Sequence, residues 1–389
     1  MRKLIPTIGT FIIITLAFAM CKEVYEPPVQ TKNVRLLVVE GFINGGQGPT
    51  TILLSRTGEL QDQGLRPELL SHVNVEGDDG SAYVLVDSLN GKYGFHQLAL
   101  GSNVKYRLHI TTADGKEYVS DYTPVRHTPP IDSVTWQMED NGVRLYVNTH
   151  DPQNATKYYQ WKYDETWEIH STYYSSLKYV RDASNRITAL IYRIPGSHSV
   201  DTTIHKCWSS LGSTSIILGS SEKLSSDVIY FPVHFVEPAS EKLSVLYSLN
   251  LKQYAMSQEA YLFMQKMKKN TEQVGTLFDP QPSQITGNIK CLSDQNEPVI
   301  GFVEVTEEQT KRIFIYNSQV PGWGFSMPCI EYVINNTVED MNKYGSDYYP
   351  TIPKTLTPLG AVQDFYAANM ESCVDCTTRG VNNKPVFWP

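Results

Sequence analysis

YRLHITTADGKEYVS, residues 106–120, is the stretch that decides the fold of this chain. Apolar and polar residues alternate from Tyr106 to Ile110, a second short run begins at Tyr118, and Asp114-Gly115 lies between the two. Alternation places every second side chain on the same face of a β-strand, and Asp-Gly is a preferred turn between antiparallel strands. Residues 106–120 therefore predict a β-hairpin.

The sequence before this hairpin repeats the pattern of short apolar runs and turns. Residues 35–43 form a Leu- and Val-rich run that is followed by Asn44-Gly45-Gly46, and further strand candidates precede the hairpin. Regular short strands with turn signals indicate a sandwich-like domain, which we place at residues 34–123. Thr128-Pro129-Pro130 follows this domain. Because proline interrupts β-ladders and stiffens linkers, these residues indicate a domain boundary.

A second and larger β-rich domain is expected over residues 131–389. Residues 171–205 are polar without a clear period and are interpreted as a long hairpin or loop. The chain beyond Pro321 is rich in Tyr, Pro and Asn and is expected to be irregular. The expected strands of this domain are apolar or alternating runs, among them 143–147, 158–163, 228–235, 243–249 and 311–315.

One long amphipathic helix is expected at residues 257–274 of this domain. Ser257 is a favourable N-cap residue, and Gly275 is a typical helix-ending residue. The expected fold class is therefore mainly β, with two sandwich-like β regions and one long amphipathic helix in the C-terminal half. Apolar side chains recur along one face of that helix, at Ala260, Phe263, Met264, Met267 and Val274.

Composition and charge narrow the functional classes. The chain has 24 tyrosines and 6 tryptophans, and aromatic residues favour strands. Its net charge of −8 becomes about −10 when residues 1–20 are removed, because Arg2 and Lys3 leave with them. Nucleic-acid binding requires a basic surface, so this acidic chain is not expected to have a nucleic-acid partner.

The first 21 residues have the features of a bacterial lipoprotein signal. Arg2 and Lys3 precede an apolar run from Ile8 to Met20, and Cys21 follows at once. A charged start and a short apolar run describe a secretion signal, and a cysteine at its end is the residue that becomes lipidated. We therefore expect residues 1–20 to be a lipoprotein signal peptide, Cys21 to be lipidated and residues 21–33 to be a tether. A plain secretory signal cut nearby is the alternative.

The sequence lacks the common catalytic and cofactor-binding motifs. It has no His-Glu-x-x-His zinc motif, no Gly-x-Ser-x-Gly nucleophile motif and no glycine-rich phosphate or dinucleotide loop. Asp78-Asp79-Gly80 lacks the remaining ligands of a calcium loop and is interpreted as a turn. We therefore expect no catalytic residue, no metal site and no cofactor, although a pair of glycosidase carboxylates would leave no such motif.

Five cysteines remain after Cys21, so an exported chain is expected to form disulfides and to leave at least one thiol over. Cys373 and Cys376 lie in the expected irregular tail. A bond from either of them to Cys329 would close a loop of about 45 residues and stabilise the fold by roughly 3–4 kcal/mol. A direct bond between Cys373 and Cys376 is the alternative.

Aromatic residues cluster between positions 158 and 174 and allow two interpretations. Those at 158–163 lie along an expected strand, so burial of alternate rings is favoured. Trp167, Tyr173 and Tyr174 lie at the edge of the polar stretch. They are candidate partner-binding residues, because exposed Tyr and Trp side chains often anchor interfaces.

Several motifs resemble those of one known family. They are Tyr158-Tyr159-Gln160-Trp161, Cys207-Trp208, Leu277-Phe278-Asp279-Pro280, Lys311-Arg312-Ile313-Phe314-Ile315 and the closing Cys373-Val374-Asp375-Cys376 with Phe387-Trp388. Over about residues 34–389, the chain is similar to the Bacteroidota outer-membrane lipoproteins that carry domain of unknown function 4249. Lys22-Glu23, directly after the lipidated cysteine, also resembles the signal that sends such lipoproteins to the cell surface. Val381 departs from the family, which usually has Gly there.

The resemblance implies a non-enzymatic accessory lipoprotein. Its expected place is the outer membrane, where the N-terminal lipid anchors it facing the cell exterior. The implied partner is a TonB-dependent transporter of a nutrient uptake system, with a glycan or peptide as candidate cargo. The alternatives are a surface hydrolase acting on glycans or peptides, and an adhesin or envelope-structural lipoprotein.

Overall fold

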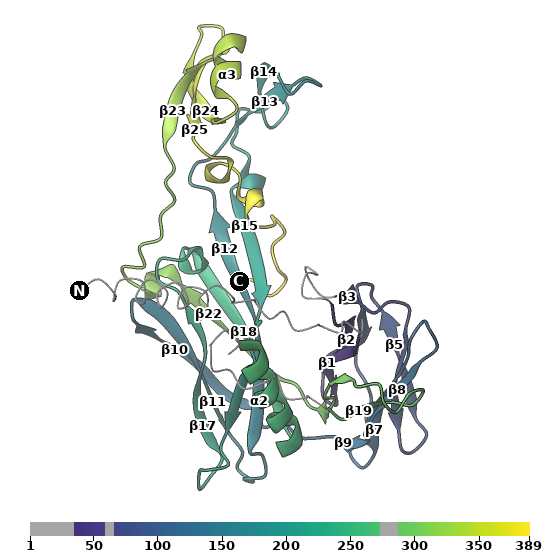
Figure 1. Cartoon of the computed structure of the whole chain (residues 1–389). Helices are drawn as coiled ribbons and strands as arrows, with labels where there is room; N and C mark the ends of the chain where they lie inside the picture. The colour runs from purple at the N-terminus through teal and green to yellow at the C-terminus, as the bar shows by residue number, and fades with distance from the viewer. Residues whose placement is uncertain (1–34, 59–65, 273–286) are drawn as a thin grey trace, which may run out of the picture.

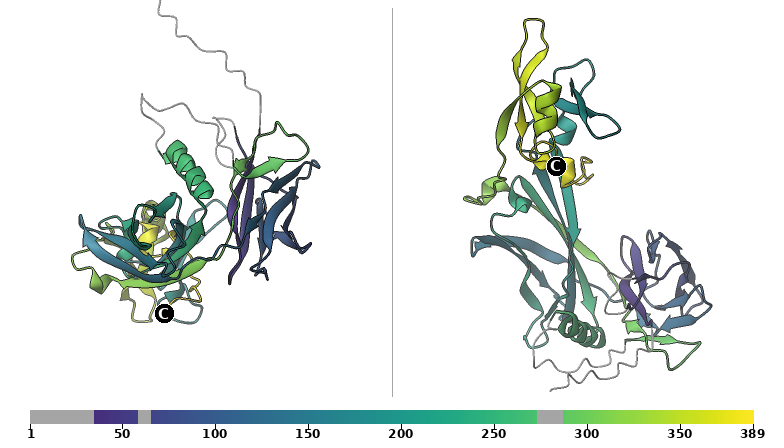
Figure 2. Two further views of the ribbon diagram at one scale, coloured as in Figure 1. Left: turned by 90° about the horizontal axis from the view of Figure 1, so that it is seen from below. Right: turned by 45° about the horizontal axis from the view of Figure 1, so that its top comes forward.

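The computed structural model describes residues 35–58, 66–272 and 287–389, and it has three connected parts (Figure 1). An N-terminal β-domain lies beside a central body, and a smaller head extends from the far end of that body (Figure 2). The chain is mainly β, as predicted. No helix within the described ranges is long and apolar enough to cross a membrane. The predicted signal peptide, Cys21 and the tether lie outside the described residues.

The predicted hairpin is confirmed and lies inside the N-terminal domain. β7 (Lys105–Thr111) and β8 (Glu117–Ser120) pair antiparallel, and Ile110 faces Tyr118 across the pair. The sheet order is β19-β8-β7-β4-β5-β6-β2-β1-β20, and alternate apolar side chains of these strands fill one core. The remaining early strands are β1 (Leu37–Asn44), β2 (Thr50–Arg56), β3 (Arg66–Pro67), β4 (His72–Gly77), β5 (Ala82–Asp87), β6 (Lys92–Phe95) and β9 (Thr123–Pro124).

Three short strands from late in the chain complete this domain. β19 (Ile289–Cys291) pairs antiparallel with β8, whereas β20 (Ile300–Gly301) and β21 (Val305–Thr306) pair in parallel with β1. The expectation that residues 131–389 form one separate domain is therefore wrong for residues 289–306. Parallel pairing joins segments that are distant in sequence, and local periodicity does not specify the partner of a strand.

Two packed sheets form the central body. β12 is the long strand at the centre of the larger sheet, whose order is β15-β12-β18-β22 with β16 beside β12. Side chains from both sheets fill a shared core that includes Leu145, Val147, Tyr247 and Leu249. The smaller sheet is β10 (Ile131–Glu139), β11 (Gly142–His150) and β17 (Val228–Val236), and the larger is β12 (Tyr158–His170), β15 (Lys206–Gly212), β16 (Ile217–Ser220), β18 (Leu246–Met256) and β22 (Gln309–Tyr316).

Helix α2 (Gln258–Glu272) confirms the predicted amphipathic helix as far as it is described. The Ser257 hydroxyl accepts a hydrogen bond from the Ala260 N–H at 3.0 Å, which is the predicted N-cap. Ala260 is buried against the sheet, and Phe263 is buried with its ring centroid 5.6 Å from that of Phe302. The predicted end at residues 274 and 275 lies outside the described residues.

The head is built from two segments that are far apart in sequence. The hairpin of β13 (Leu177–Arg181) and β14 (Ile187–Tyr192) confirms the hairpin interpretation of the polar stretch. The expectation of an irregular chain beyond Pro321 is wrong, because a three-stranded sheet and helix α3 (Val338–Tyr344) form there around a small core. The sheet order is β23 (Glu331–Asn335), β25 (Val362–Ala368) and β24 (Tyr349–Leu356).

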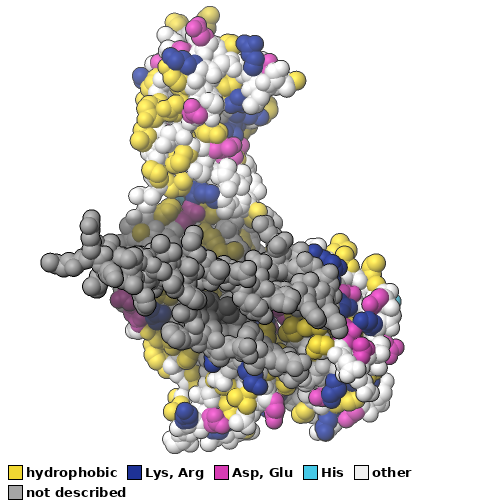
Figure 3. Space-filling view, viewed as in Figure 1, with side chains coloured by type: hydrophobic (Ala, Val, Ile, Leu, Met, Phe, Trp, Pro, Cys, Tyr) yellow, Lys and Arg dark blue, Asp and Glu magenta, His cyan; other side chains and the backbone are white. Residues whose placement is uncertain are grey.

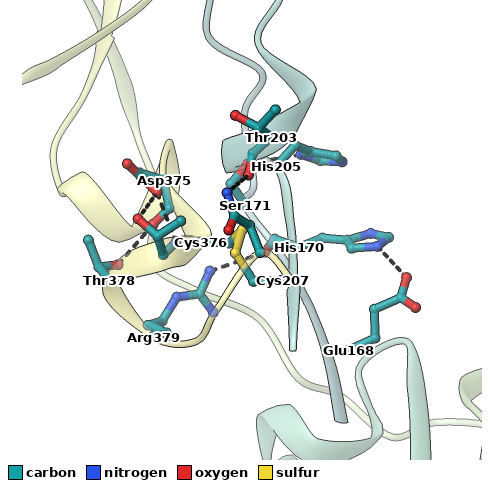
Figure 4. Close-up of a disulfide and its surroundings, with 12 residues drawn as sticks. Glu168, His170, Ser171, Thr203, His205, Cys207, Asp375, Cys376, Thr378 and Arg379 are labelled. Carbon is teal, nitrogen blue, oxygen red and sulfur yellow. Dashed lines mark hydrogen bonds and ion pairs between the residues drawn. A yellow bond between two sulfur atoms is a disulfide. The ribbon is translucent and has the colours of Figure 1, made fainter. Parts of the chain in front are cut away.

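Two disulfides fasten the head and the C-terminal tail. Cys329–Cys373, with Cα atoms 5.8 Å apart, is one of the two bonds predicted for Cys329. Cys207–Cys376, with Cα atoms 5.7 Å apart, was not predicted and joins the tail to β15 (Figure 4). Cys291 is buried and free, so the predicted left-over thiol is present. The 3₁₀ turns are η1 (Thr202–Ile204), η2 (Glu241–Leu243), η3 (Asn317–Gln319), η4 (Glu371–Cys373) and η5 (Cys376–Thr378).

A buried carboxylate lies where the N-terminal domain meets α2. Glu304 is only 3% exposed, and both of its carboxylate oxygens accept the Ser257 N–H at 3.1 Å. Arg126 lies 3.8 Å from the same carboxylate. Burial raises the pKa of Glu304 and outweighs the opposing effects of Ser257 and Arg126.

Replacing Glu304 tests this junction through the pH dependence of stability. A folded-state pKa above the unfolded value means that a stabilising contribution is present at low pH and is lost as pH rises through the folded pKa. We therefore expect Glu304→Gln to melt at progressively higher temperature relative to the wild type as pH rises from 4 to 7. Glu304→Ala should lower the free energy of unfolding by about 1–3 kcal/mol, because the Ser257 N–H loses its acceptor. A difference between Glu304→Gln and the wild type that does not change with pH would contradict the raised pKa.

Candidate ligand-binding groove

Strand β12 presents two chemically different faces. Tyr159, Trp161 and Tyr163 point into the core between the two sheets of the central body, which confirms the predicted burial of alternate rings. Side chains of a strand alternate between faces, so Gln160, Lys162 and Asp164 lie on the opposite face. That second face is turned toward β1 and α2.

Three adjoining cavities follow the second face of β12, and we refer to them together as the groove. The first and second hold about 320 Å³ each and share Phe42 and Lys162 in their walls. The second and third, which holds about 300 Å³, share Asp164 and Gly212. The three cavities therefore lie next to one another along β12, from helix α2 to Phe387 in the C-terminal tail.

The two ends of the groove differ in polarity. At the α2 end the wall is mostly apolar, with Phe263, Met264, Met267 and Phe302 among its residues. The middle is lined by charged side chains from both domains, namely Glu40, Lys162, Asp164, Lys252 and Glu308. Concave sites of this size with mainly apolar walls and a few placed polar groups are typical of small-ligand binding.

Direct contacts hold the N-terminal domain against the central sheet at the groove. The Phe42 and Tyr254 rings stack with their centroids 4.5 Å apart. The Glu308 N–H donates to the Asn44 side-chain oxygen at 3.0 Å, and the Tyr254 hydroxyl donates to the Glu308 carboxylate. Burial, followed by the charge of Glu308, raises the pKa of Tyr254, so this phenol stays protonated. These contacts fix the distance between the two walls.

The positively charged side chains of the groove differ in whether they have an ion-pair partner. Lys252 forms an ion pair with Asp164 at 2.7 Å, whereas the Lys162 ammonium has no hydrogen bond or ion pair with any residue that the structure describes. Burial lowers the pKa of Lys162. Arg312 donates to the Ser248 hydroxyl at 3.0 Å and lies 3.6 Å from the centre of the Phe387 ring.

The predicted partner-binding residues have different positions in the structure. Trp167 is 8% exposed and packs in the core, so its prediction as a surface anchor is wrong. Its place on β12, in phase with Trp161, buries it. Tyr173 is half-buried, and its hydroxyl donates to the Cys329 carbonyl at 3.1 Å. Tyr174 is 49% exposed and stacks on His205, so only Tyr174 is well placed to touch a partner.

A serine and two histidines lie near the Cys207–Cys376 bond without forming a hydrolytic site (Figure 4). The Ser171 hydroxyl donates to the Tyr173 carbonyl at 2.9 Å, which uses its only proton. His205 Nδ1, also 2.9 Å from that hydroxyl, must then be the donor and cannot act as its general base. Ser171 is also buried. Within the described ranges, no group of three or more His, Cys, Asp or Glu residues is arranged to hold a metal ion.

The neighbouring Glu168 anchors the C-terminal tail. Its carboxylate accepts the Trp388 indole N–H at 2.8 Å, and His170 and Lys206 bind its other oxygen at 2.7 and 2.8 Å. Burial alone would raise the pKa of Glu168, but these three partners outweigh it and hold the pKa at about 2. This network is a structural clamp, and it places Phe387 at the end of the groove.

Gln160 and Lys162 belong to no catalytic or ligand-binding motif, so the sequence does not mark them as site residues. Both lie in the aromatic stretch between positions 158 and 174, where the rings are the stronger signal. Two polar residues at alternate positions, interleaved with three buried rings, indicate a strand with a second face that requires partners of its own. That pattern was the available signal, but the wall supplied by β1 and α2 could not be inferred from it.

Comparisons with known proteins identify a family but no activity. A search among curated proteins gave no match. Among solved structures, a chitinase ChiA74 from Bacillus thuringiensis is 10% identical, with a TM-score of 0.16, over 52% of this chain and 30% of that one. A Salmonella alpha-2-macroglobulin mutant is also 10% identical, with a TM-score of 0.17, over 78% of this chain and 15% of that one. Likenesses this weak support no argument about function, and the chain spans less than a third of either protein.

The family model with the description domain of unknown function (DUF4249) matches residues 22–312. This range includes the N-terminal domain and most of the central body, and with them the first two cavities of the groove. The closing Cys373–Cys376 motif lies beyond the matched residues. Since the match covers more than half of the sequence, the chain belongs to the DUF4249 family.

Proposed function

We propose that this protein is a non-enzymatic binding protein of the bacterial outer membrane, tethered by lipid at Cys21 and displayed on the cell surface. In this proposal it is an accessory of a TonB-dependent transporter in a nutrient uptake system of Bacteroidota, and it holds cargo for that transporter. The lipoprotein signal and the family resemblance support the location and the partner. The observation that carries the binding function is the groove.

The groove is a candidate ligand-binding site whose walls come from several parts of the chain. β1 of the N-terminal domain, β12 and α2 of the central body, and Phe387 of the tail all contribute. Its length suits an extended ligand, and its aromatic and cationic side chains suit recognition by stacking and charge. The carboxylates of Asp164 and Glu308 are each engaged by a neighbour, which favours binding over acid–base hydrolysis.

The head offers a surface for the transporter. β23 is an edge strand of its sheet, and hydrophobic side chains gather on this side of the head (Figure 3). Ile330, Tyr332 and Val333 are 53%, 45% and 45% exposed. An exposed apolar edge strand is a liability in a free monomer, so coverage by a partner would explain it. Confinement of both proteins to one membrane raises their effective concentration, so a modest interface suffices.

Co-purification tests this proposal. The lipidated protein, recovered from outer membranes in mild detergent, is expected to bring a TonB-dependent receptor with it. Tyr332→Lys in the head should reduce that recovery at least several-fold, whereas Tyr230→Lys, at a tyrosine of β17 that is 58% exposed, should not. Recovery of the protein alone, together with turnover of a glycan or peptide by the pure protein, would replace the proposal with a surface hydrolase.

A further inference from the structure

The first cavity of the groove has an apolar wall that fits a hydrocarbon chain. Phe263, Met264 and Met267 line it from α2, and Val39 and Phe302 line it from the N-terminal domain. Met264, Met267 and Phe302 are only partly buried, so part of their apolar surface remains open to a ligand. Methionine side chains are flexible and polarizable, which suits them to packing against chains of variable shape.

The Lys162 ammonium on the sheet wall of the same cavity has no direct ion-pair partner among the residues that the structure describes. Lys162 and Lys252 are directly opposite each other on adjacent strands, and like charges in that position repel. Asp164 forms its ion pair with Lys252 and so leaves Lys162 without a close counter-ion. Glu40 and Glu308 attract Lys162 only at longer range, and the Phe42 ring lies 5.7 Å from the ammonium. A ligand anion beside Lys162 would supply the direct partner that this ammonium lacks.

A buried amide lies next to this cation. Gln160 is two residues before Lys162 on the same face of β12, is 2% exposed and lines the first cavity. Its side-chain oxygen has no hydrogen-bond partner among the residues that the structure describes. Unpaired buried polar atoms are unfavourable, and a Gln amide offers both an acceptor and donors. The amide nitrogen of Gln160 can donate to a ligand carboxylate, whereas its unpaired oxygen would need a hydrogen-bond donor elsewhere on the ligand.

We propose that the first cavity binds an amphipathic carboxylate, with its hydrocarbon chain between α2 and β1 and its carboxylate accepting from the Lys162 ammonium and the Gln160 amide nitrogen. This inference rests on the proposed binding function and specifies its ligand. The apolar wall alone would bind any apolar molecule of suitable size, whereas Lys162 favours a ligand with a negative charge. A short carboxylate would gain the charge interaction without the apolar contacts, so both halves of the ligand are required.

Three probes separate these contributions in a calorimetric titration of the whole mature chain, prepared without lipid as Cys21→Ala. The probes are decanoate, decan-1-ol of the same chain length, and butanoate with the same head group. Decanoate is expected to bind, decan-1-ol to bind at least 10-fold more weakly, and butanoate to show no measurable heat. Equal affinity for decanoate and decan-1-ol would overturn the proposal, because the cavity would then not recognise the charge.

Variants assign the binding to this cavity. Lys162→Gln should weaken decanoate about 10- to 100-fold, as expected for loss of a charge-assisted contact, and should leave decan-1-ol unchanged. Lys162→Arg should restore most of the decanoate affinity. Met264→Gln should weaken both long-chain probes about 5-fold. The matched control is Lys290→Gln, at an exposed lysine paired with Asp121 outside the groove, which should behave as the wild type. Unchanged decanoate binding by Lys162→Gln would overturn the site.

The outcomes of this titration are separate from those of the co-purification. If the protein recovers a receptor but binds no decanoate, the ligand class is wrong and the transport role stands. If decanoate binds through Lys162 but no receptor is recovered, the cavity is assigned and the transporter partnership is wrong. Displacement of decanoate by phosphatidylglycerol vesicles, with the same dependence on Lys162, would show that a membrane lipid competes for the site and would overturn the assignment to a free carboxylate.

Discussion

Removing Cys207 and Cys376 together, as Cys207→Ala with Cys376→Ala, is expected to cause the largest loss of stability of any change to the tail. The bond spans 169 residues, and the chain-entropy model assigns a loop of that length about 5 kcal/mol. The tail would also lose its fixed position on β15, where Trp388 packs against Trp208 and donates to Glu168. We therefore expect the tail to detach before the sheets of the central body unfold.

Hydrogen exchange read segment by segment is the suitable measurement, because a chain with several parts need not unfold in one step. Protection in residues 376–389 should fall in this variant while protection in β18 persists. The matched comparison is Cys329→Ala with Cys373→Ala, which opens a loop of 44 residues and should cost about 4 kcal/mol, mainly in the head. Peptide mapping of the wild type that joins Cys207 to Cys373 would contradict the connectivity.

Trp161→Ala is expected to lower the stability of the central body by about 3–5 kcal/mol, the usual cost of removing a large buried aromatic side chain. Trp161 is fully buried and stacks with Tyr159 and Phe231, at centroid distances of 5.7 and 5.4 Å. Its indole N–H donates to the Gln253 side-chain oxygen at 2.8 Å, which would lose this donor.

Chemical denaturation monitored by circular dichroism measures this loss. Tyr230→Ala is the control, since this side chain is 58% exposed on β17 and stacks on only one ring, Tyr146. It should cost less than about 1 kcal/mol, as surface substitutions usually do. A loss below about 1 kcal/mol for Trp161→Ala would mean that the core between the two sheets is not packed as described.

The sequence was informative where structure depends on local patterns. The hairpin at 106–120 follows from alternation and one Asp-Gly turn, and α2 follows from Ser257 and an apolar stripe. Asp78-Asp79-Gly80 is indeed the turn between β4 and β5. Each of these features depends only on residues that are close together in the sequence. The local pattern of apolar and turn residues is therefore enough to predict them.

The features that the sequence did not predict depend on residues that are distant in the chain. β20 and β21 are too short to show a period, and they exist because β1 offers an edge for parallel pairing. Trp167 is buried because β12 continues to His170, beyond the expected end of the aromatic strand. The head sheet was missed because Pro and Tyr mask its strands, although Thr337 accepting the Asp340 N–H at 3.1 Å is an ordinary N-cap signal for α3. The groove could not be predicted because its walls come from three distant parts of the chain, namely β1, β12 with α2, and the C-terminal tail.

The central claim is that the groove on the open face of β12 holds the ligand of this protein. Native mass spectrometry of the chain recovered from its own outer membranes tests it most directly. We expect a bound mass in addition to the lipidated polypeptide, greatly reduced in Lys162→Gln and retained in Lys290→Gln. The same bound mass in equal amount in all three proteins, or none in any of them, would contradict the claim.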